Sequence, residues 1–412
     1  MKTDDDHNDK ITRRSAIAVS LGTVGAAALG GMLEAAPPPS VKSGRRIWTV
    51  TNPDTKNPIT QFRLRPEDLG TKATGCSVEK RILQSGLSMG VETIEVDNGK
   101  MSFVVLPTRG MGIWQARCGN VRLGWDSPVN GPVNPAFVRL DAPDGLGWLA
   151  GFDEMLVRCG LEYNGGPEFQ DNGILRYGLH GRISNTPAHK VEVSVDEADG
   201  RISVTGVVDE ARLYGNKLRL RSTVSTLPGR AKITIRDTVE NLSAEPGELQ
   251  LIYHTNFGPP LLGSGAKVIA VTKRVTPFDD VAAKGLSTWN VMGVPVTGAP
   301  EQCFACELSA MENGNTAVML QSPDRRSAVL YRFNKKQLPC FTIWKNPQPA
   351  SDGYAIGLEP GTNYPYTKTQ EKQQGRVISL PPGDSKTFEL SLEYLPDSEA
   401  VRKAQNEIQK IE

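Results

Sequence analysis

The chain has 412 residues, 38% of them hydrophobic and 23% charged, so it can bury a substantial core in one large domain or two ordinary ones. Lys and Arg total 47 against 46 Asp and Glu, a net charge of +1 without any outstanding basic block, which excludes nucleic acid as an expected partner and favours a small neutral molecule. The 41 glycines and 29 prolines are spread along the chain, a pattern typical of many short strands joined by tight turns and therefore of a mainly-β fold.

The first 36 residues differ in composition from the rest of the chain. Two adjacent arginines precede an apolar run over 16–33 that is rich in Ala and Gly and is followed by three prolines. This pattern predicts an export signal and resembles the twin-arginine type, which carries folded proteins across a bacterial inner membrane. We expect removal of residues 1–36, a short linker over 37–43, no retained membrane anchor, and a periplasmic or secreted mature protein.

Turn signals divide the following residues into antiparallel hairpins. The apolar runs 91–96 and 101–106 flank Asp97-Asn98-Gly99, a strong hairpin signal. The stretch 108–173 is rich in Gly, Pro, Asp and Trp and is expected to form long loops over one face of a sheet. Further strands are expected over 191–195, 202–207, 218–224, 233–239, 249–254, 317–321, 328–333, 341–344, 354–358 and 387–395.

These patterns predict one large antiparallel β-sandwich over residues 44–396, with a split near residue 175 as the alternative. The tail, 397–412, is expected to be a helix on the outside of a sheet, because Asp397 can cap it and apolar residues recur at three-to-four spacing. No repeat of fixed period and no Gly-rich phosphate loop is present, which disfavours nucleotide-dependent chemistry.

Six cysteines are scattered through the chain rather than packed into a small framework. Cys303 and Cys306 have the spacing of metal ligands or of a redox pair. No second cysteine pair and no nearby histidine completes a zinc site, so we expect an unreactive pair or a local disulfide.

Three residues at expected strand ends are candidates for catalysis. Glu359 follows an apolar run and precedes a Pro-Gly turn, which would place its carboxylate at the end of a strand, where sites are often built. His180 precedes Gly181, which allows a close approach of backbone or ligand, and His254 follows the apolar run 249–253. The alternative interpretations are a solvated surface glutamate and hydrogen-bonded structural histidines.

The surroundings of these residues resemble a known family. Leu-His-Gly at His180, Tyr-His-Thr-Asn-Phe-Gly at His254 and Leu-Glu-Pro-Gly-Thr-Asn-Tyr-Pro at Glu359 occur in the order and approximate separation seen in aldose 1-epimerases. Over residues 85–396 the chain is thus similar to the galactose mutarotase superfamily, and its Pro-x-Arg-Gly-Met segment at 107–111 resembles a poorly characterised, DUF4432-like branch. The resemblance implies a β-supersandwich with an open sugar-binding cleft.

The resemblance also implies metal-free epimerase chemistry, in which a base removes the proton of the anomeric hydroxyl and an acid protonates the ring oxygen. Glu359 would be the base and His254 the acid, while His180 would hold a sugar hydroxyl. The candidate sugar-binding residues are Arg109, Arg158 and Arg182 through their forked donors, Asp279 or its neighbour Asp280 as the acidic residue that mutarotases use, and Trp344 and Trp125 as stacking surfaces.

Two other functions remain open from the sequence. The first is a metal-dependent sugar isomerase or lyase in which His180, His254 and Glu359 bind a divalent metal, because two imidazoles and a carboxylate are a common ligand set. The second is a carbohydrate-binding protein without catalytic activity. The order of residues around His254 differs from the usual Thr-Asn-His pattern of mutarotases, so the substrate could differ from a free hexose.

Overall fold

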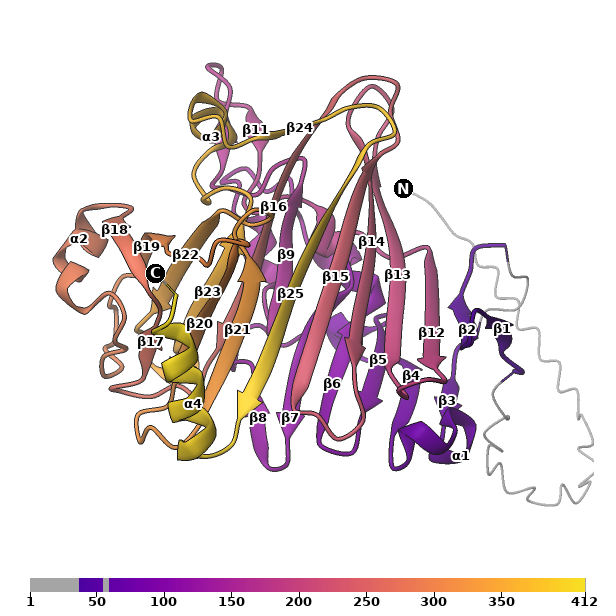
Figure 1. The fold of residues 1–412 in the computed structure, drawn as a ribbon. Coiled ribbons are helices and arrows are strands. Elements are labelled where there is room, and N and C mark those ends of the chain that lie inside the picture. Colours follow the sequence, from indigo (N-terminus) through magenta and orange to yellow (C-terminus); the bar gives the residue numbers. More distant parts are fainter. Residues whose placement is uncertain (1–36, 55–58, 412) are drawn as a thin grey trace, which may run out of the picture. The chain divides into compact units, whose positions relative to one another are not determined.

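The structure is a computed structural model that describes residues 37–54 and 59–411, so the expected export signal lies outside the described residues. Antiparallel strands form two large sheets that lie face to face (Figure 1). The predicted mainly-β, antiparallel fold is confirmed. Both sheets take strands from either side of residue 175.

In the described part of the chain, the first sheet has ten strands. Their spatial order is β1 (Ser40–Lys42), β2 (Arg45–Thr51), β12 (Lys190–Asp196), β13 (Ile202–Ala211), β14 (Lys217–Thr226), β15 (Lys232–Asn241), β25 (Ser385–Leu395), β21 (Ala328–Asn334), β20 (Asn315–Gln321) and β17 (Lys267–Ile269).

The second sheet has thirteen strands within the same described ranges. Its main path is β18 (Thr272–Pro277), β19 (Gln302–Leu308), β22 (Cys340–Asn346), β23 (Ala355–Gly361), β16 (Gly247–Phe257), β9 (Leu156–Leu161), β7 (Gly112–Cys118), β6 (Met101–Leu106), β5 (Glu92–Asp97), β4 (Ser77–Ile82) and β3 (Phe62–Leu64). The strands outside this path are β8 (Val121–Leu123) beside β7, β24 (Ile378–Leu380) beside β16, and the separate pair β10 (Glu168–Phe169) and β11 (Leu175–Tyr177).

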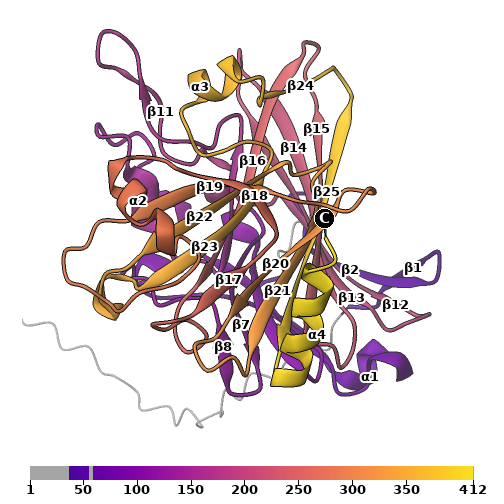
Figure 2. The ribbon, with the colours of Figure 1, turned by 60° about the vertical axis from the view of Figure 1, so that its left-hand side comes forward.

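The α-helices are short except at the C-terminal end: α1 (Pro66–Leu69), α2 (Asp280–Lys284), α3 (Lys368–Gln373) and α4 (Ser398–Ile408). The predicted C-terminal helix is confirmed as α4, where the Asp397 side chain accepts a hydrogen bond from the backbone N–H of Ala400. Its apolar face, formed by Val401, Ala404 and Ile408, packs on the outside of the ten-stranded sheet near β20 and β21 (Figure 2). None of the helices in the described ranges has the length and apolar character needed to cross a membrane.

The main core lies between the two sheets. Because side chains alternate between the faces of a strand, every second residue of β16 points into this core, including Leu251 and Tyr253. The intervening residues, including Ile252 and His254, point to the opposite face of the thirteen-stranded sheet, where Ile252 joins a second apolar cluster. His254, Glu359 and His180, the three candidate catalytic residues, meet on this opposite face.

The expectation that residues 108–173 form only long loops was wrong, because β7, β8 and β9 lie in this stretch. The most important of these is β9, which lies between β16 and β7 in the thirteen-stranded sheet. Every residue of Leu156–Leu161 is buried. The β9 sequence, Leu-Val-Arg-Cys-Gly-Leu, has neither the alternation nor the apolar run that identified the other strands.

Candidate active site

His254 and Glu359 lie opposite each other on neighbouring strands. Thr255 of β16 is paired with Leu358 of β23, so the antiparallel register places His254 beside Glu359. His254 Nε2 is 3.2 Å from Glu359 Oε1, and the two side chains are only 5% and 2% exposed. Two motifs that are distant in the sequence therefore form one buried imidazole–carboxyl pair.

The other ring nitrogen of His254 is held by Asn256, two residues further along β16. His254 Nδ1 is 2.7 Å from Asn256 Oδ1. The Asn256 side-chain amide in turn donates a hydrogen bond of 3.0 Å to the backbone carbonyl of Glu154. The imidazole is thus fixed from one side by a buried amide and faces Glu359 with the other side.

Burial changes the protonation of both members of the pair. It raises the pKa of the Glu359 carboxyl well above its ordinary value, and the negative charge of Glu301 raises this pKa further. Burial and the nearby His180 lower the pKa of His254 well below its ordinary value, although the hydrogen bond with Asn256 opposes this shift. Both shifts favour the uncharged forms of the two side chains, and such displaced pKa values are frequent in active sites.

The Glu359 carboxyl occupies space that the absence of a side chain at Gly357 leaves open. A Cβ atom at Gly357 would lie 2.6 Å from Glu359 Oε1 and 3.1 Å from His254 Cε1. Within the described residues, Glu359 Oε1 has no aligned hydrogen-bond partner, nor does the hydroxyl of Thr342, which is paired with Glu359 on β22. Because buried polar atoms normally have partners, these two atoms are available to a ligand or water.

His180 adopts a backbone conformation that is unusual for a residue other than glycine, with φ of +57°. Its Nδ1 is 2.9 Å from the carbonyl oxygen of Asn164, and its ring centroid is 5.6 Å from that of His254. Gly181 is required next to it, because a Cβ atom there would lie 2.3 Å from the carbonyl oxygen of Gly160. The structure therefore brings the second candidate histidine into the same cluster.

Acidification is expected to destabilise the protein through His180. Burial lowers the pKa of His180 from 6.5 to about 4, so the unfolded chain takes up this proton at a higher pH than the folded chain does. The contribution to stability is present in full above about pH 6.5 and is lost as the pH falls towards about 4. Between about pH 7 and about pH 4.5, we expect the free energy of urea unfolding to fall by about 1–3 kcal/mol more in the wild type than in His180→Gln.

The control for this comparison is His189→Gln, which changes a histidine that is 40% exposed and lies outside the cluster. His189→Gln should retain the acid dependence of the wild type. An unchanged acid dependence in His180→Gln would contradict the prediction.

Four aromatic side chains enclose the pair. The rings of Phe152 and Trp344 lie 5.0 and 5.4 Å from the His254 ring, and Trp125 packs on both of them at 4.8 and 6.1 Å. Trp148 lies 4.7 Å from Phe152. The expected open cleft is therefore covered here by aromatic side chains, of which Trp125, Trp148 and Phe152 are buried. The predicted stacking residues lie in this cover, with Trp344 nearest to the pair.

The structure does not bring Arg158 into the cluster. Its side chain points from β9 into the core between the sheets, where it forms a fully buried ion pair with Asp237 of β15 at 2.5 Å. Its remaining donors bond Ser222 at 2.8 Å and the carbonyl oxygen of Met111 at 2.6 Å. The predicted sugar-binding role does not fit this position, because no donor faces the opposite side of the sheet, where His254 lies.

Arg109 and Arg182 also lie away from the pair. Arg109 is buried, forms an ion pair of 2.5 Å with Glu154, and donates to the carbonyl oxygens of Val133 and Gly151. It therefore holds the segment that carries the aromatic cover rather than a ligand. Arg182 is exposed and lines a cavity of about 80 Å³ together with Glu210 and other residues.

Glu301, which the sequence analysis did not select, occupies a position better suited to an acidic binding residue than Asp279 does. Asp279 is exposed and caps α2, accepting a hydrogen bond of 2.7 Å from the backbone N–H of Ala282. Glu301 Oε2 accepts a hydrogen bond of 2.7 Å from the indole N–H of Trp344, and its charge acts on Glu359. Glu301 directly precedes β19, and an acidic residue at the start of a strand could have indicated its position. The sequence patterns did not predict β19, so this signal was not recognised.

All six cysteines are free thiols. Cys303 and Cys306 lie on β19, where Cys306 points into the main core and Cys303 is paired with Trp344 of β22. Burial raises the pKa of the Cys303 thiol well above its ordinary value, as do Glu301 and Glu359. The expected unreactive pair fits this position, and the expected local disulfide does not form.

The metal-dependent alternative requires His180, His254 and Glu359 to converge on one ion. Across residues 37–54 and 59–411, no group of three or more His, Cys, Asp or Glu side chains is placed to hold a metal ion. As placed, His180, His254 and Glu359 do not converge on one ion.

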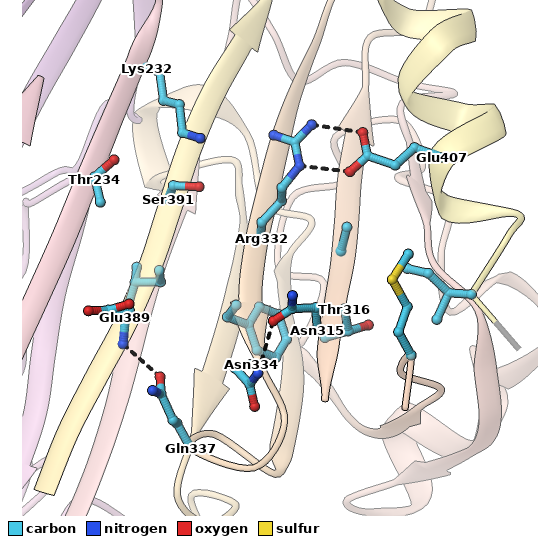
Figure 3. Close-up of a pocket in the computed structure, with 15 residues that line it drawn as sticks. Lys232, Thr234, Asn315, Thr316, Arg332, Asn334, Gln337, Glu389, Ser391 and Glu407 are labelled. Carbon is cyan, nitrogen blue, oxygen red and sulfur yellow. Dashed lines mark hydrogen bonds and ion pairs between the residues drawn. The ribbon is translucent and has the colours of Figure 1, made fainter. Parts of the chain in front are cut away.

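A cavity of about 410 Å³ lies elsewhere, on the outer face of the ten-stranded sheet beside α4 (Figure 3). Several of its polar groups are bonded to each other. Arg332 donates two hydrogen bonds to Glu407, and Gln337 accepts one from the backbone of Glu389. We place the candidate active site at His254 and Glu359 instead, because the displaced pKa values and the unpartnered buried oxygens occur there.

The face-to-face antiparallel sheets define the class of fold, which is that of the galactose mutarotase-like proteins. A galactose mutarotase-like protein from Clostridium acetobutylicum has a TM-score of 0.54 and 16% identity, covering 77% of this chain and 98% of its own. A galactose mutarotase related enzyme from Lactobacillus acidophilus has a TM-score of 0.50 and 13% identity, covering 74% of this chain and 98% of its own. At these identities the likeness shows the fold alone.

Within this class, the chain belongs to the family of the domain of unknown function DUF4432, whose model matches residues 88–394. A crystal structure from Klebsiella pneumoniae subsp. pneumoniae, provisionally designated an aldose 1-epimerase, is 36% identical with a TM-score of 0.86 and covers 89% of this chain and 96% of its own. No protein of curated function matches the chain. The resemblance stated from the sequence motifs is confirmed.

Proposed function

We propose that this protein is a carbohydrate epimerase of the aldose 1-epimerase type, which acts on a small sugar hemiacetal at His254 and Glu359. The observation that carries the proposal is the 3.2 Å contact between a buried imidazole and a buried carboxyl. Burial displaces the pKa values of both groups towards their uncharged forms, which places a potential proton donor beside a potential proton acceptor. Membership of the family supports the proposal, because a relative at 36% identity is provisionally designated an aldose 1-epimerase.

The reaction requires two proton transfers, one at each of the two oxygen atoms that are bonded to the anomeric carbon. One group removes the proton of the anomeric hydroxyl while the other protonates the ring oxygen, which opens the ring. Rotation about the bond between C1 and C2, followed by closure, produces the other anomer. Each positioned acid or base contributes about 10²–10⁴-fold to the rate. The resemblance assigns the base to Glu359 and the acid to His254.

The surroundings of the pair favour an uncharged sugar. The face of Trp344, which is partly exposed, can stack on the apolar side of a pyranose, and His180 can bond a hydroxyl. Glu301 adds negative charge close to Glu359, which disfavours anionic substrates such as uronic acids or sugar phosphates. We propose that Glu301, together with Trp344, binds sugar hydroxyls at the edge of the site.

The direct test is saturation transfer between the anomeric proton signals of candidate sugars in the presence of the protein. We expect catalysed exchange with neutral aldoses and much slower exchange with uronic acids and aldose phosphates. Absence of exchange in all three classes would overturn the proposed epimerase. Sugar binding without exchange would instead indicate a carbohydrate-binding protein.

Gly357→Ala is expected to lower anomer exchange by about 10²-fold while the protein remains folded. The added methyl group would lie 2.6 Å from Glu359 Oε1, the free end of a flexible side chain, so the carboxyl moves and the sheet does not. The rate should be measured by saturation transfer, and the fold by circular dichroism and thermal unfolding.

The matched control for this variant is Gly293→Ala, because a Cβ atom at Gly293 meets no atom within 4 Å. Gly293→Ala should retain wild-type exchange. Full activity of Gly357→Ala would show that the position of the Glu359 carboxyl is not important for the reaction.

A further inference from the structure

A second cavity, of about 370 Å³, lies at one edge of the ten-stranded sheet, beside β17, β20 and α4 (Figure 2). Lys267 of β17 is paired with Gln321 of β20, so their side chains point to the same face of the sheet. Two residues along each strand, Ile269 and Met319 are also paired, and both pack in the apolar cluster beneath α4. Lys267 and Gln321 therefore point to the outer face of the sheet, where Gln405 of α4 also lines this edge cavity.

The charged side chains that line the edge cavity are all positive. They are Lys267 and Arg325, and no Asp or Glu of the described chain is among the lining residues. None of the ion pairs in residues 37–54 and 59–411 involves either cation. The polar side chains beside them are amides, namely those of Asn290, Gln321 and Gln405. Two cations and three amides favour a ligand with negative charge and several acceptor oxygens.

The turn after β20 holds Arg325 at the edge cavity. Arg325 has a φ of +60°, which is unusual for a residue other than glycine, and its backbone N–H donates a hydrogen bond of 3.0 Å to the carbonyl oxygen of Ser322. The carboxylate of Asp324 accepts a hydrogen bond of 2.7 Å from the Ser322 hydroxyl and one of 3.0 Å from the backbone N–H of Arg326. The carboxylate next to Arg325 in the sequence thus stabilises the turn.

The Gln321 side chain indicates a ligand independently of charge. Gln321 is only 7% exposed and lines the edge cavity, and none of the side-chain hydrogen bonds in the described part of the chain uses its amide. Buried polar groups normally have partners, so this amide is available to a molecule in the cavity. Asn290 is held nearby, because its side-chain amide donates a hydrogen bond of 3.2 Å to the carbonyl oxygen of Val268, which lies next to Lys267.

We propose that the edge cavity is an oxyanion-binding site, separate from the site at His254 and Glu359, for a small molecule that carries a phosphate or sulfate group. The Arg325 guanidinium can donate two parallel hydrogen bonds to such a group, and the Lys267 ammonium adds a point charge. The volume of about 370 Å³ lies within the range of small-molecule sites, so the cavity admits an organic molecule as well as a bare ion. Binding there does not require epimerase activity at the other site.

Isothermal titration calorimetry of the full-length protein at low ionic strength tests the site. The probes are inorganic phosphate, inorganic sulfate and an aldose phosphate, with the parent neutral aldose as a competitor. We expect one-to-one binding of at least one inorganic ion and of the aldose phosphate, weakened by added NaCl because salt screens the two cations. The neutral aldose should not displace the inorganic ion. Absence of saturable binding of all three probes, or displacement by the neutral aldose, would overturn the proposal.

Substitutions identify the site of binding. Lys267→Gln and Arg325→Gln should each lower the affinity for the probes by about 10-fold, because each removes a charge-assisted hydrogen bond. Gln321→Leu should weaken binding without a change in charge. The matched control is Arg326→Gln, the same chemical change at an exposed neighbour that does not line the cavity, which should retain wild-type affinity.

Thermal unfolding without ligand shows whether each variant is folded, and saturation transfer shows whether anomer exchange is retained. Wild-type affinity in both Lys267→Gln and Arg325→Gln would place the anion elsewhere and overturn the proposal. If the probes bind as expected and no sugar exchanges, the proposed epimerase fails and the oxyanion site stands.

Discussion

Glu359→Gln is expected to lower anomer exchange by about 10²–10⁴-fold, with sugar binding and the fold retained. Glutamine has the same shape as glutamic acid, but it cannot take up a proton from the sugar or give one back. The carboxyl is 2% exposed and burial raises its pKa, so an uncharged amide suits this position and should not lower stability. Saturation transfer measures the rate, and thermal unfolding measures the stability.

The matched control is Glu312→Gln, which makes the same chemical change at an exposed position. This control should retain wild-type exchange with all substrates. A Glu359→Gln protein with wild-type exchange would exclude Glu359 from the chemistry, and a protein that failed to fold would indicate a structural role for its carboxyl.

Asp237→Asn is expected to lower the free energy of unfolding by about 3–5 kcal/mol. Asp237 accepts two hydrogen bonds from Arg158, at 2.5 and 3.1 Å, and one from the hydroxyl of Tyr253 at 2.9 Å. The Arg158 and Asp237 side chains are fully buried between the sheets, so removal of the negative charge leaves an uncompensated guanidinium in the core. Urea unfolding of the purified protein measures the loss.

Two further variants separate this effect from simple loss of a hydrogen bond. Asp209→Asn breaks an ion pair with Arg219 whose side chains are 29% and 32% exposed, and should cost about 0–1 kcal/mol. The double variant Arg158→Met, Asp237→Leu removes both charges and should be more stable than Asp237→Asn alone. A double variant less stable than the single one would show that the charges themselves stabilise the core.

The sequence motifs singled out three side chains that the structure brings together, because His180, His254 and Glu359 are each followed by residues with a clear local function. Gly181, for example, allows the close packing of the backbone behind His180. The strands β16 and β23 were also predicted, since their apolar runs end at turns. What the motifs could not supply was the register, and it is the register that places His254 opposite Glu359.

The roles of charged residues were less predictable. The sequence does not distinguish an arginine that binds a sugar from one that is buried in the core, because both have the same donors. The side chains of β9 alternate between the two faces of the sheet, and this alternation directs Arg158 towards Asp237. Asp279 follows a strand-like segment, but its carboxylate accepts a hydrogen bond from the first turn of α2. Glu301 was missed because its neighbour in space, Trp344, lies on a different strand. Contacts of this kind depend on tertiary structure rather than on local pattern.

The position of β16 in the thirteen-stranded sheet has a consequence for folding. β16 lies between β9, from the first half of the chain, and β23, from near its end. Pairing of such distant segments requires closure of long loops, which slows folding, whereas the hairpins β12–β13 and β14–β15 need only local turns. The imidazole and the carboxyl can meet only after both neighbours of β16 are in register. We therefore expect catalytic activity to return late during refolding, after most of the strand signal has recovered.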